Sequence, residues 1–146
     1  MDPHPFNILL IEDNPGDVAL FKIALKKNAQ DFHLDVACDG EEALQMLSHH
    51  RPYGQLANPD LIILDLNLPK ISGHEVLEKV KGTESLKHIP IVIFTSSDYE
   101  KDIKKAYQLH GNAYIIKPKN LDELNEIIGS FYHFWLKTAS LPSMSG

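Results

Sequence analysis

Residues 61–65 read Leu61-Ile62-Ile63-Leu64-Asp65, four consecutive apolar residues followed at once by a carboxylate. Short apolar runs rich in Ile, Leu and Val, bounded by polar or turn residues, are typical of strands buried on both faces of a parallel sheet. Three more runs have this form: Ile8–Ile11 before Glu12-Asp13, Ile91–Phe94 before Thr95-Ser96, and Tyr114–Ile116 before Lys117-Pro118. We predict a strand at each run, with a chemically useful side chain at its carboxyl end.

Helical patterns separate these strands. Apolar residues recur at three- and four-residue steps in four stretches, which begin near Val18, Ala43, Val76 and Leu121. A fifth helix is predicted to start at a capping box formed by Ser97 and Glu100 and to run to roughly His110.

The remaining elements complete a strict alternation of strand and helix. An alternating stretch, Leu34–Cys38, predicts one more strand at the sheet edge, and the Pro- and Gly-containing segment 50–60 predicts a loop. Five strands alternating with five helices predict an α/β fold, in which helices cover both faces of a doubly wound parallel sheet.

The composition limits the class of protein. A chain of 146 residues with 43% hydrophobic and 23% charged residues is typical of one globular domain. A net charge of −6 argues against a nucleic-acid-binding surface, and no apolar stretch approaches the length of a membrane-spanning helix. Cys38 is the sole cysteine, which fits a reducing compartment, and we expect it to be a small buried residue. A basic, apolar leader is absent, so we expect a cytoplasmic protein.

The strand ends predict a site for phosphoryl chemistry. In a parallel sheet all carboxyl ends meet at one edge, where ligands bind. Asp65 could attack phosphorus as a nucleophile and form an acyl phosphate, but its charge repels an anionic donor. A hard divalent cation, Mg²⁺, would cancel that repulsion, with Glu12, Asp13, Asp65 and the backbone carbonyl of Asn67 as its oxygen ligands.

The other strand ends supply donors for a phosphoryl group. Lys117 could pair with Asp65 at rest and with a phosphoryl oxygen afterwards. Thr95 offers a hydroxyl, and the backbone amides of Leu66 and Ser96 could bind the remaining oxygens.

These motifs together resemble the receiver domain of two-component response regulators. The residues that carry the resemblance are Ile11-Glu12-Asp13-Asn14, Leu64-Asp65-Leu66-Asn67-Leu68-Pro69, Thr95-Ser96 and Lys117-Pro118. The resemblance implies a flavodoxin-like sheet of order 2-1-3-4-5, Mg²⁺ as cofactor and a phosphohistidine on a sensor kinase as donor. It further implies that Thr95 and Tyr114 form a switch pair, in which Thr95 moves toward the phosphoryl group and Tyr114 then swings inward.

The resemblance extends to a subgroup and to the domain limits. The segment 12–17 and the ending Phe134-Trp135-Leu136 with Leu141-Pro142 are similar to the stand-alone regulators of cyanobacterial and bacterial phytochromes. This implies a red-light-sensing histidine kinase as donor. We expect a receiver domain over residues 6–136, a short tail over 137–146 and no output domain.

The last predicted helix carries more apolar surface than one sheet face needs. One stripe contains Leu121, Leu124, Ile128, Phe131 and Trp135, and further apolar residues are Ile127, Tyr132 and Phe134. A helix that covers a sheet needs a single apolar stripe. We predict a homodimer through Phe131, Phe134 and Trp135; the alternative is that the tail folds back over these aromatic residues.

Other functions fit the sequence less well. A phosphohydrolase of the haloacid-dehalogenase type needs a second aspartate where this chain has Asn67, and its nucleophile follows the first strand. A receiver-like interaction module that is never phosphorylated is not supported, because every residue needed for phosphorylation is present. A dinucleotide binder would have a glycine fingerprint after the first strand. Within the receiver family two roles stay open: a terminal effector that binds a target, and a phosphate shuttle in a phosphorelay.

Overall fold

The structure is a computed structural model that describes residues 6–28, 31–48 and 58–142 of the chain. Most of the loop predicted over 50–60 lies outside these ranges. The described residues contain five strands and five α-helices in alternation, followed by a π-helical turn over His133–Thr138. None of the described helices is long and apolar enough to cross a membrane.

The strands form one parallel sheet of order β2-β1-β3-β4-β5, as predicted. Their bounds are Phe6–Ile11 (β1), Phe32–Ala37 (β2), Leu61–Leu64 (β3), Ile91–Thr95 (β4) and Ala113–Ile116 (β5). Every residue of β3 and β4 is buried, because both faces of these strands are covered by helices. The carboxyl ends of all five strands therefore meet at one edge.

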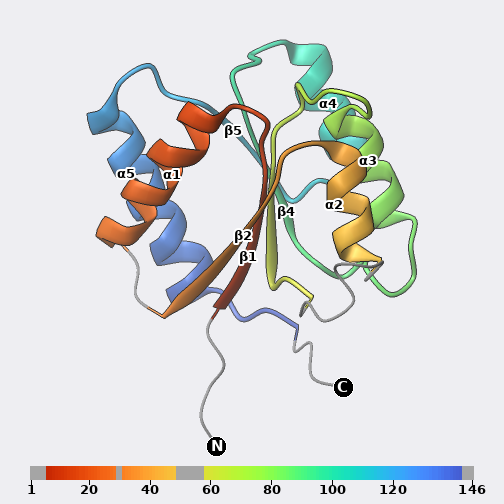
Figure 1. Cartoon of the computed structure of the whole chain (residues 1–146), viewed down its shortest axis with the longest axis horizontal. Coiled ribbons are helices and arrows are strands. Elements are labelled where there is room, and N and C mark those ends of the chain that lie inside the picture. Colours follow the sequence, from red (N-terminus) through yellow and green to blue (C-terminus); the bar gives the residue numbers. More distant parts are fainter. Residues whose placement is uncertain (1–5, 29–30, 49–57, 143–146) are drawn as a thin grey trace, which may run out of the picture.

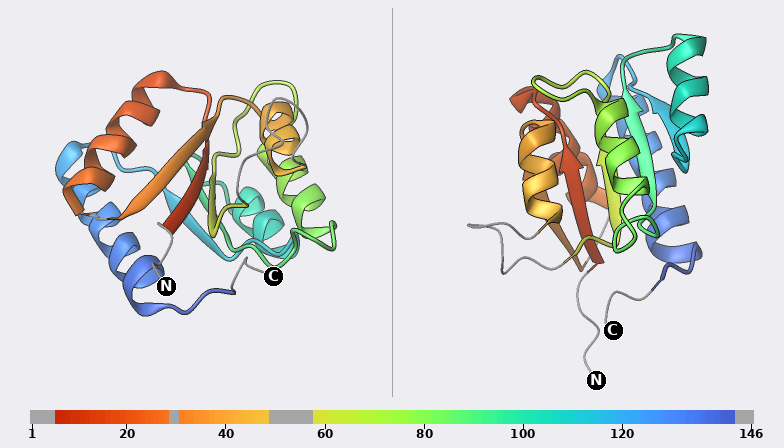
Figure 2. Two further views of the ribbon diagram at one scale, coloured as in Figure 1. Left: turned by 60° about the horizontal axis from the view of Figure 1, so that its bottom comes forward. Right: turned by 90° about the vertical axis from the view of Figure 1, so that its right-hand side faces the viewer.

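Helices cover the sheet in two layers (Figure 1, Figure 2). Their bounds are Pro15–Asn28 (α1), Gly40–Leu47 (α2), Gly73–Lys81 (α3), Glu100–Gln108 (α4) and Leu121–Tyr132 (α5). Helices α1 and α5 lie on one face, and α2, α3 and α4 lie on the other. Each layer encloses its own cluster of buried apolar residues. The doubly wound architecture is confirmed.

Two local predictions at the second strand are wrong. Strand β2 begins at Phe32, which pairs with Phe6, and ends at Ala37 rather than at Cys38. The backbone N–H of Cys38 donates instead to Glu42 Oε1, at 2.8 Å, and so leaves the ladder. Cys38 is consequently exposed and not a buried apolar residue.

The predicted capping box of α4 is not formed. The helix begins at Glu100 after Tyr99, whose side chain makes no capping bond. The Ser97 hydroxyl donates to Asp102 Oδ2 at 2.5 Å and accepts the N–H of Tyr99, before the helix, at 3.3 Å; it bonds no N–H of the helix itself. At the other end His110 adopts φ 73°, a left-handed conformation that cannot continue the helix past Gln108.

The last helix packs through part of the predicted stripe. Leu124, Ile128 and Phe131 are buried against the sheet, whereas Leu121, in the first turn, is 56% exposed. Phe131 is only 5% exposed, so it belongs to the core and its assignment to a dimer surface is wrong. Phe134, in the π-helical turn, is 52% exposed. The exposed aromatic surface is therefore smaller than the sequence suggested.

Gly73 fixes the loop that follows β3. Its N–H donates to the Leu66 carbonyl at 3.0 Å, and a Cβ atom at this position would lie 2.3 Å from the Asp65 carbonyl oxygen. Backbone atoms cannot yield as a flexible side chain would. Only glycine lets the start of α3 approach the chain at Asp65 and Leu66 this closely.

We expect Gly73→Ala to lower the free energy of unfolding by roughly 1–3 kcal/mol, the usual penalty for overpacking. Urea unfolding followed by circular dichroism measures it. Gly129→Ala is the control, because a Cβ there meets only the side chain of Asn28. Equal stability of the Gly73→Ala protein and the wild type would contradict the close approach.

Candidate functional site

Backbone hydrogen bonds continue past the strand ends and hold the polar residues in place. The Glu12 N–H donates to the Ala37 carbonyl at 3.0 Å, and the Asp65 N–H donates to the Ile11 carbonyl at 3.0 Å. The Lys117 N–H donates to the Thr95 carbonyl at 2.7 Å. Residues from four strand ends are thus fixed side by side before their side chains interact.

Three carboxylates converge at this edge, as the sequence predicted. Oxygen atoms of Glu12, Asp13 and Asp65 lie within 4.8 Å of one another, with Glu12 and Asp65 buried and Asp13 exposed. Glu12 Oε2 accepts the Asn14 N–H at 3.1 Å. Hard divalent cations bind through such carboxylate oxygens, and the exposed Asp13 leaves a side of the cluster open to water. The donor set fits a divalent cation.

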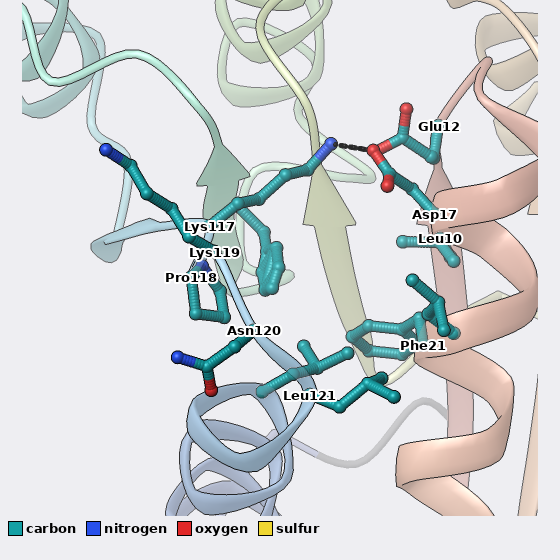
Figure 3. A pocket seen from close by; sticks show the side chains of 12 residues that line it. Leu10, Glu12, Asp17, Phe21, Lys117, Pro118, Lys119, Asn120 and Leu121 are labelled. Carbon is teal, nitrogen blue, oxygen red and sulfur yellow. Dashed lines mark hydrogen bonds and ion pairs between the residues drawn. The ribbon is translucent and has the colours of Figure 1, made fainter.

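Lys117 is the ammonium at the centre of this cluster. Its Nζ atom donates to Glu12 Oε1 at 2.5 Å, to Asp17 Oδ2 at 2.8 Å and to Asp65 Oδ2 at 2.9 Å. Figure 3 shows the Lys117 side chain crossing from the end of β5 toward Glu12 and Asp17. The pairing of Lys117 with Asp65 was predicted from the sequence.

Asp17 is a site residue that sequence reasoning missed, since it was treated as part of the turn that starts a helix. The cap of α1 is Asn14, whose Oδ1 accepts the Asp17 N–H at 3.0 Å. This leaves the Asp17 carboxylate free to bond Lys117. The usable signal was its position in the first turn of a helix that begins directly after β1, which places it at the same edge.

Burial and hydrogen bonding set the charge states of the cluster. Burial raises the pKa of Glu12 to about 7, although the bond from Lys117 acts in the opposite direction. Burial would also raise the pKa of Asp65, but the bonds from Lys117, Asn67 and Thr95 outweigh it and hold that pKa below its usual value. For Lys117, burial favours the neutral form, but three carboxylate partners outweigh it and raise the pKa. Asp65 is thus kept ionised.

The remaining predicted residues surround Asp65. Its Oδ1 atom accepts the Thr95 hydroxyl at 2.8 Å and the Asn67 N–H at 3.1 Å. Leu66 and Ser96 directly follow Asp65 and Thr95, so their backbone amides lie at the same edge. All predicted residues of the phosphoryl site therefore belong to one neighbourhood.

Tyr114 lies one step away from this neighbourhood, on β5. It is half-buried against the core beneath α4, and its hydroxyl donates to the Ser97 carbonyl at 2.9 Å. Burial raises the pKa of Tyr114, and the neighbouring carboxylates Asp102 and Asp65 act in the same direction. Both hydroxyls of the expected switch pair are thus already bonded: Thr95 to Asp65, and Tyr114 to the loop after β4.

Comparisons with known proteins agree with this geometry. The family model described as the response regulator receiver domain matches residues 8–129. Response regulator Rcp1 of Synechocystis is 40% identical over 139 residues, 95% of each chain. The crystal structure of the phosphorylated cyanobacterial phytochrome response regulator RcpA is 42% identical, with a TM-score of 0.91 over 95% of this chain and 99% of that one.

A second solved structure bears on the acidic cluster. The Mn²⁺-bound form of Rcp1 has 40% identity and a TM-score of 0.90, over 95% of this chain and 100% of that one. The family model, the relatives and the sheet order agree: this chain belongs to the response regulator receiver domain family and is homologous to cyanobacterial phytochrome response regulators.

Proposed function

We propose that this protein accepts a phosphoryl group on Asp65 from a sensor histidine kinase, with Mg²⁺ held by Glu12, Asp13, Asp65 and the Asn67 carbonyl. One observation carries the proposal. The ionised Asp65 carboxylate lies at the open edge of the sheet, with two further carboxylates within 4.8 Å and an ammonium at 2.9 Å. A nucleophile, oxygen ligands for a cation and a charge partner for phosphate are thus gathered in one place.

The transfer step follows from these contacts. A carboxylate oxygen of Asp65 attacks the phosphorus, the bond between phosphorus and the donor imidazole nitrogen breaks, and an acyl phosphate forms. A divalent cation held by Glu12, Asp13 and Asp65 would supply neutralisation of the charge on the phosphoryl oxygens. Lys117 and Thr95, which both bond Asp65 in this structure, then donate to phosphoryl oxygens, together with the amides of Leu66 and Ser96.

Thr95 and Tyr114 transmit the phosphorylation of Asp65 to the protein surface. A phosphoryl group on Asp65 changes the acceptor to which the Thr95 hydroxyl donates, and Tyr114 senses this change through the β4–α4 loop that its own hydroxyl binds. As a result, the surface formed by α4, β5 and α5 changes when Asp65 is phosphorylated.

The donor we propose is a phytochrome-type kinase, because RcpA, at 42% identity, is named as a cyanobacterial phytochrome response regulator. We also propose a cytoplasmic location, which suits a free thiol at Cys38, and no nucleic-acid partner, which suits the net charge of −6. The receiver unit comprises residues 6–136, with 137–146 as a tail. A phosphate shuttle between two histidine-containing domains is the alternative role.

Replacing the nucleophile tests the proposal most simply. We expect Asp65→Asn to abolish labelling by acetyl phosphate with Mg²⁺, while the far-ultraviolet circular dichroism stays that of the wild type. Intact-protein mass spectrometry measures the label, and EDTA should prevent it in the wild type. A label of undiminished intensity on another residue of the variant would refute the assignment.

The charge state of Glu12 predicts how cation binding depends on pH. Burial raises the pKa of Glu12 to about 7, so below that pH a proton competes with a cation for this side chain. Cation affinity should therefore fall as the pH drops below 7, approaching about tenfold per pH unit for one displaced proton, and should level off above pH 8. Asp65 does not titrate in this range, because its pKa is lowered.

Calorimetric titrations with MgCl₂ between pH 5.5 and 8.5 measure this dependence. Glu12→Gln is the control, since an amide has no proton to lose, and its affinity should vary little with pH. A wild-type affinity that is constant from pH 5.5 to 8.5 would contradict the role of Glu12.

We further propose a homodimer through Phe134 and Trp135. Phe134 remains 52% exposed although the tail is described as far as Pro142, so residues 139–142 do not cover it. It stacks edge-on against Trp135, with 5.1 Å between ring centroids, and borders a groove between β5 and α5. A protruding aromatic beside an apolar groove is self-complementary under a two-fold axis, so a second copy fits this face.

We expect Phe134→Asp to convert a dimer into monomers, because a buried carboxylate without a partner strongly opposes association. Size-exclusion chromatography with light scattering measures the mass. Ile23→Asp is the control: Ile23 is 58% exposed on α1 and does not line the groove that Phe134 borders. If the Phe134→Asp protein were still a dimer, this surface would not be the dimer interface.

A further inference from the structure

The hydrogen-bonding capacity of the Lys117 ammonium is fully used. It has three N–H donors, and they meet Glu12, Asp17 and Asp65 at 2.5, 2.8 and 2.9 Å. Two of these partners, Glu12 and Asp65, are carboxylates of the acidic cluster, whereas Asp17 is not a member of it. The ammonium and an incoming cation therefore compete for two of the same three side chains.

Each oxygen atom of the two shared carboxylates already accepts at least one hydrogen bond. Glu12 accepts from Lys117 and from the Asn14 N–H, one bond to each oxygen. Asp65 accepts from Lys117 on Oδ2 and from Thr95 and Asn67 on Oδ1. A divalent cation held by these carboxylates would repel the ammonium that donates to the same two side chains. It would therefore weaken the two bonds by which Lys117 holds the cluster.

Asp17 offers the ammonium another position. It lies in the first turn of α1, where its carboxylate is partly exposed and already 2.8 Å from Lys117 Nζ. Asp17 and Lys117 both line a cavity of about 170 Å³ that lies between α1 and the start of α5. Figure 3 shows both side chains reaching over this space, with Leu10 and Phe21 beneath. The lysine side chain has room to shift toward Asp17 without displacing the core.

We propose that Asp17 is a positioning residue, which receives the Lys117 ammonium when a divalent cation takes up Glu12 and Asp65. This inference rests on the proposed cation site. Asp17 keeps the lysine charged, close to Asp65 and away from the cation. Without Asp17, the ammonium competes with the cation for the shared carboxylates or moves into water.

A double-mutant cycle on Mg²⁺ affinity tests the inference, because it isolates the part of the Asp17 effect that passes through Lys117. We expect Asp17→Asn to weaken Mg²⁺ binding by about threefold, in keeping with an ion pair that is partly exposed. In a Lys117→Met background the same change should have no more effect than Asp98→Asn. Asp98 is an exposed acid in the loop after β4, so its removal reports the general loss of one negative charge.

Calorimetry measures the affinities, and thermal unfolding confirms that each variant is folded. An Asp17→Asn effect equal to that of Asp98→Asn, or one as large in the Lys117→Met background as in the wild type, would overturn the positioning role. Asp13→Asn separates this result from failure of the site itself. If the Asp13→Asn variant bound Mg²⁺ with the affinity of the wild type, both the cation site and the inference would be overturned.

Discussion

The ammonium of Lys117 is the group on which the organisation of this edge depends. Two carboxylates, Glu12 and Asp65, are buried there, and buried like charges oppose folding unless a cation compensates them. Lys117 follows β5, which lies two strands away from β3 in the sheet. Neighbouring strands are about 4.8 Å apart, so only a long side chain can span that distance. One flexible cation thereby ties β1, β3 and β5 together at their carboxyl ends.

This arrangement explains why the resting site is both stable and ready to change. The carboxylates of Glu12 and Asp65, which pair with Lys117, are also suited to bind a divalent cation. In the resting site the ammonium of Lys117 compensates their charge, and a bound divalent cation can take over that role. Thr95 adds a bond to Asp65 from β4, and Tyr114 connects the next loop to β5. A change in charge at Asp65 therefore acts directly on side chains at the ends of two other strands, Thr95 on β4 and Lys117 after β5.

Much of this could be predicted because parallel strands constrain their sequences strongly. Runs buried on both faces, such as Leu61–Leu64, have to be apolar throughout, and their carboxyl ends have to meet. The convergence of Glu12, Asp13 and Asp65 followed from this rule alone. Asp17 was not predicted as a site residue because it belongs to a helix. There the direction of its side chain depends on which residue caps the first turn. The Ser97 and Glu100 pattern misled because α4 begins only at Glu100, so Ser97 lies before the helix and bonds Asp102 and the Tyr99 N–H instead.

Burial at the C-terminal end was harder to predict. Phe131 and Phe134 are both aromatic and only three residues apart, yet the first is core and the second is exposed. The chain changes from α- to π-helical hydrogen bonding at His133, which alters the direction of every side chain after it. Trp135, which lies in this turn, is only partly buried against the cluster beneath α5, whereas the predicted stripe gave it the same role as Ile128.

Paramagnetic broadening by Mn²⁺ tests most directly whether the carboxylates of β1 and β3 share one cation. In amide spectra of the ¹⁵N-labelled protein, substoichiometric Mn²⁺ should broaden the resonances of residues 12–14 and 65–67 before all others. Broadening that begins instead at the acidic first turn of α5, where Asp122 and Glu123 lie, would contradict the account.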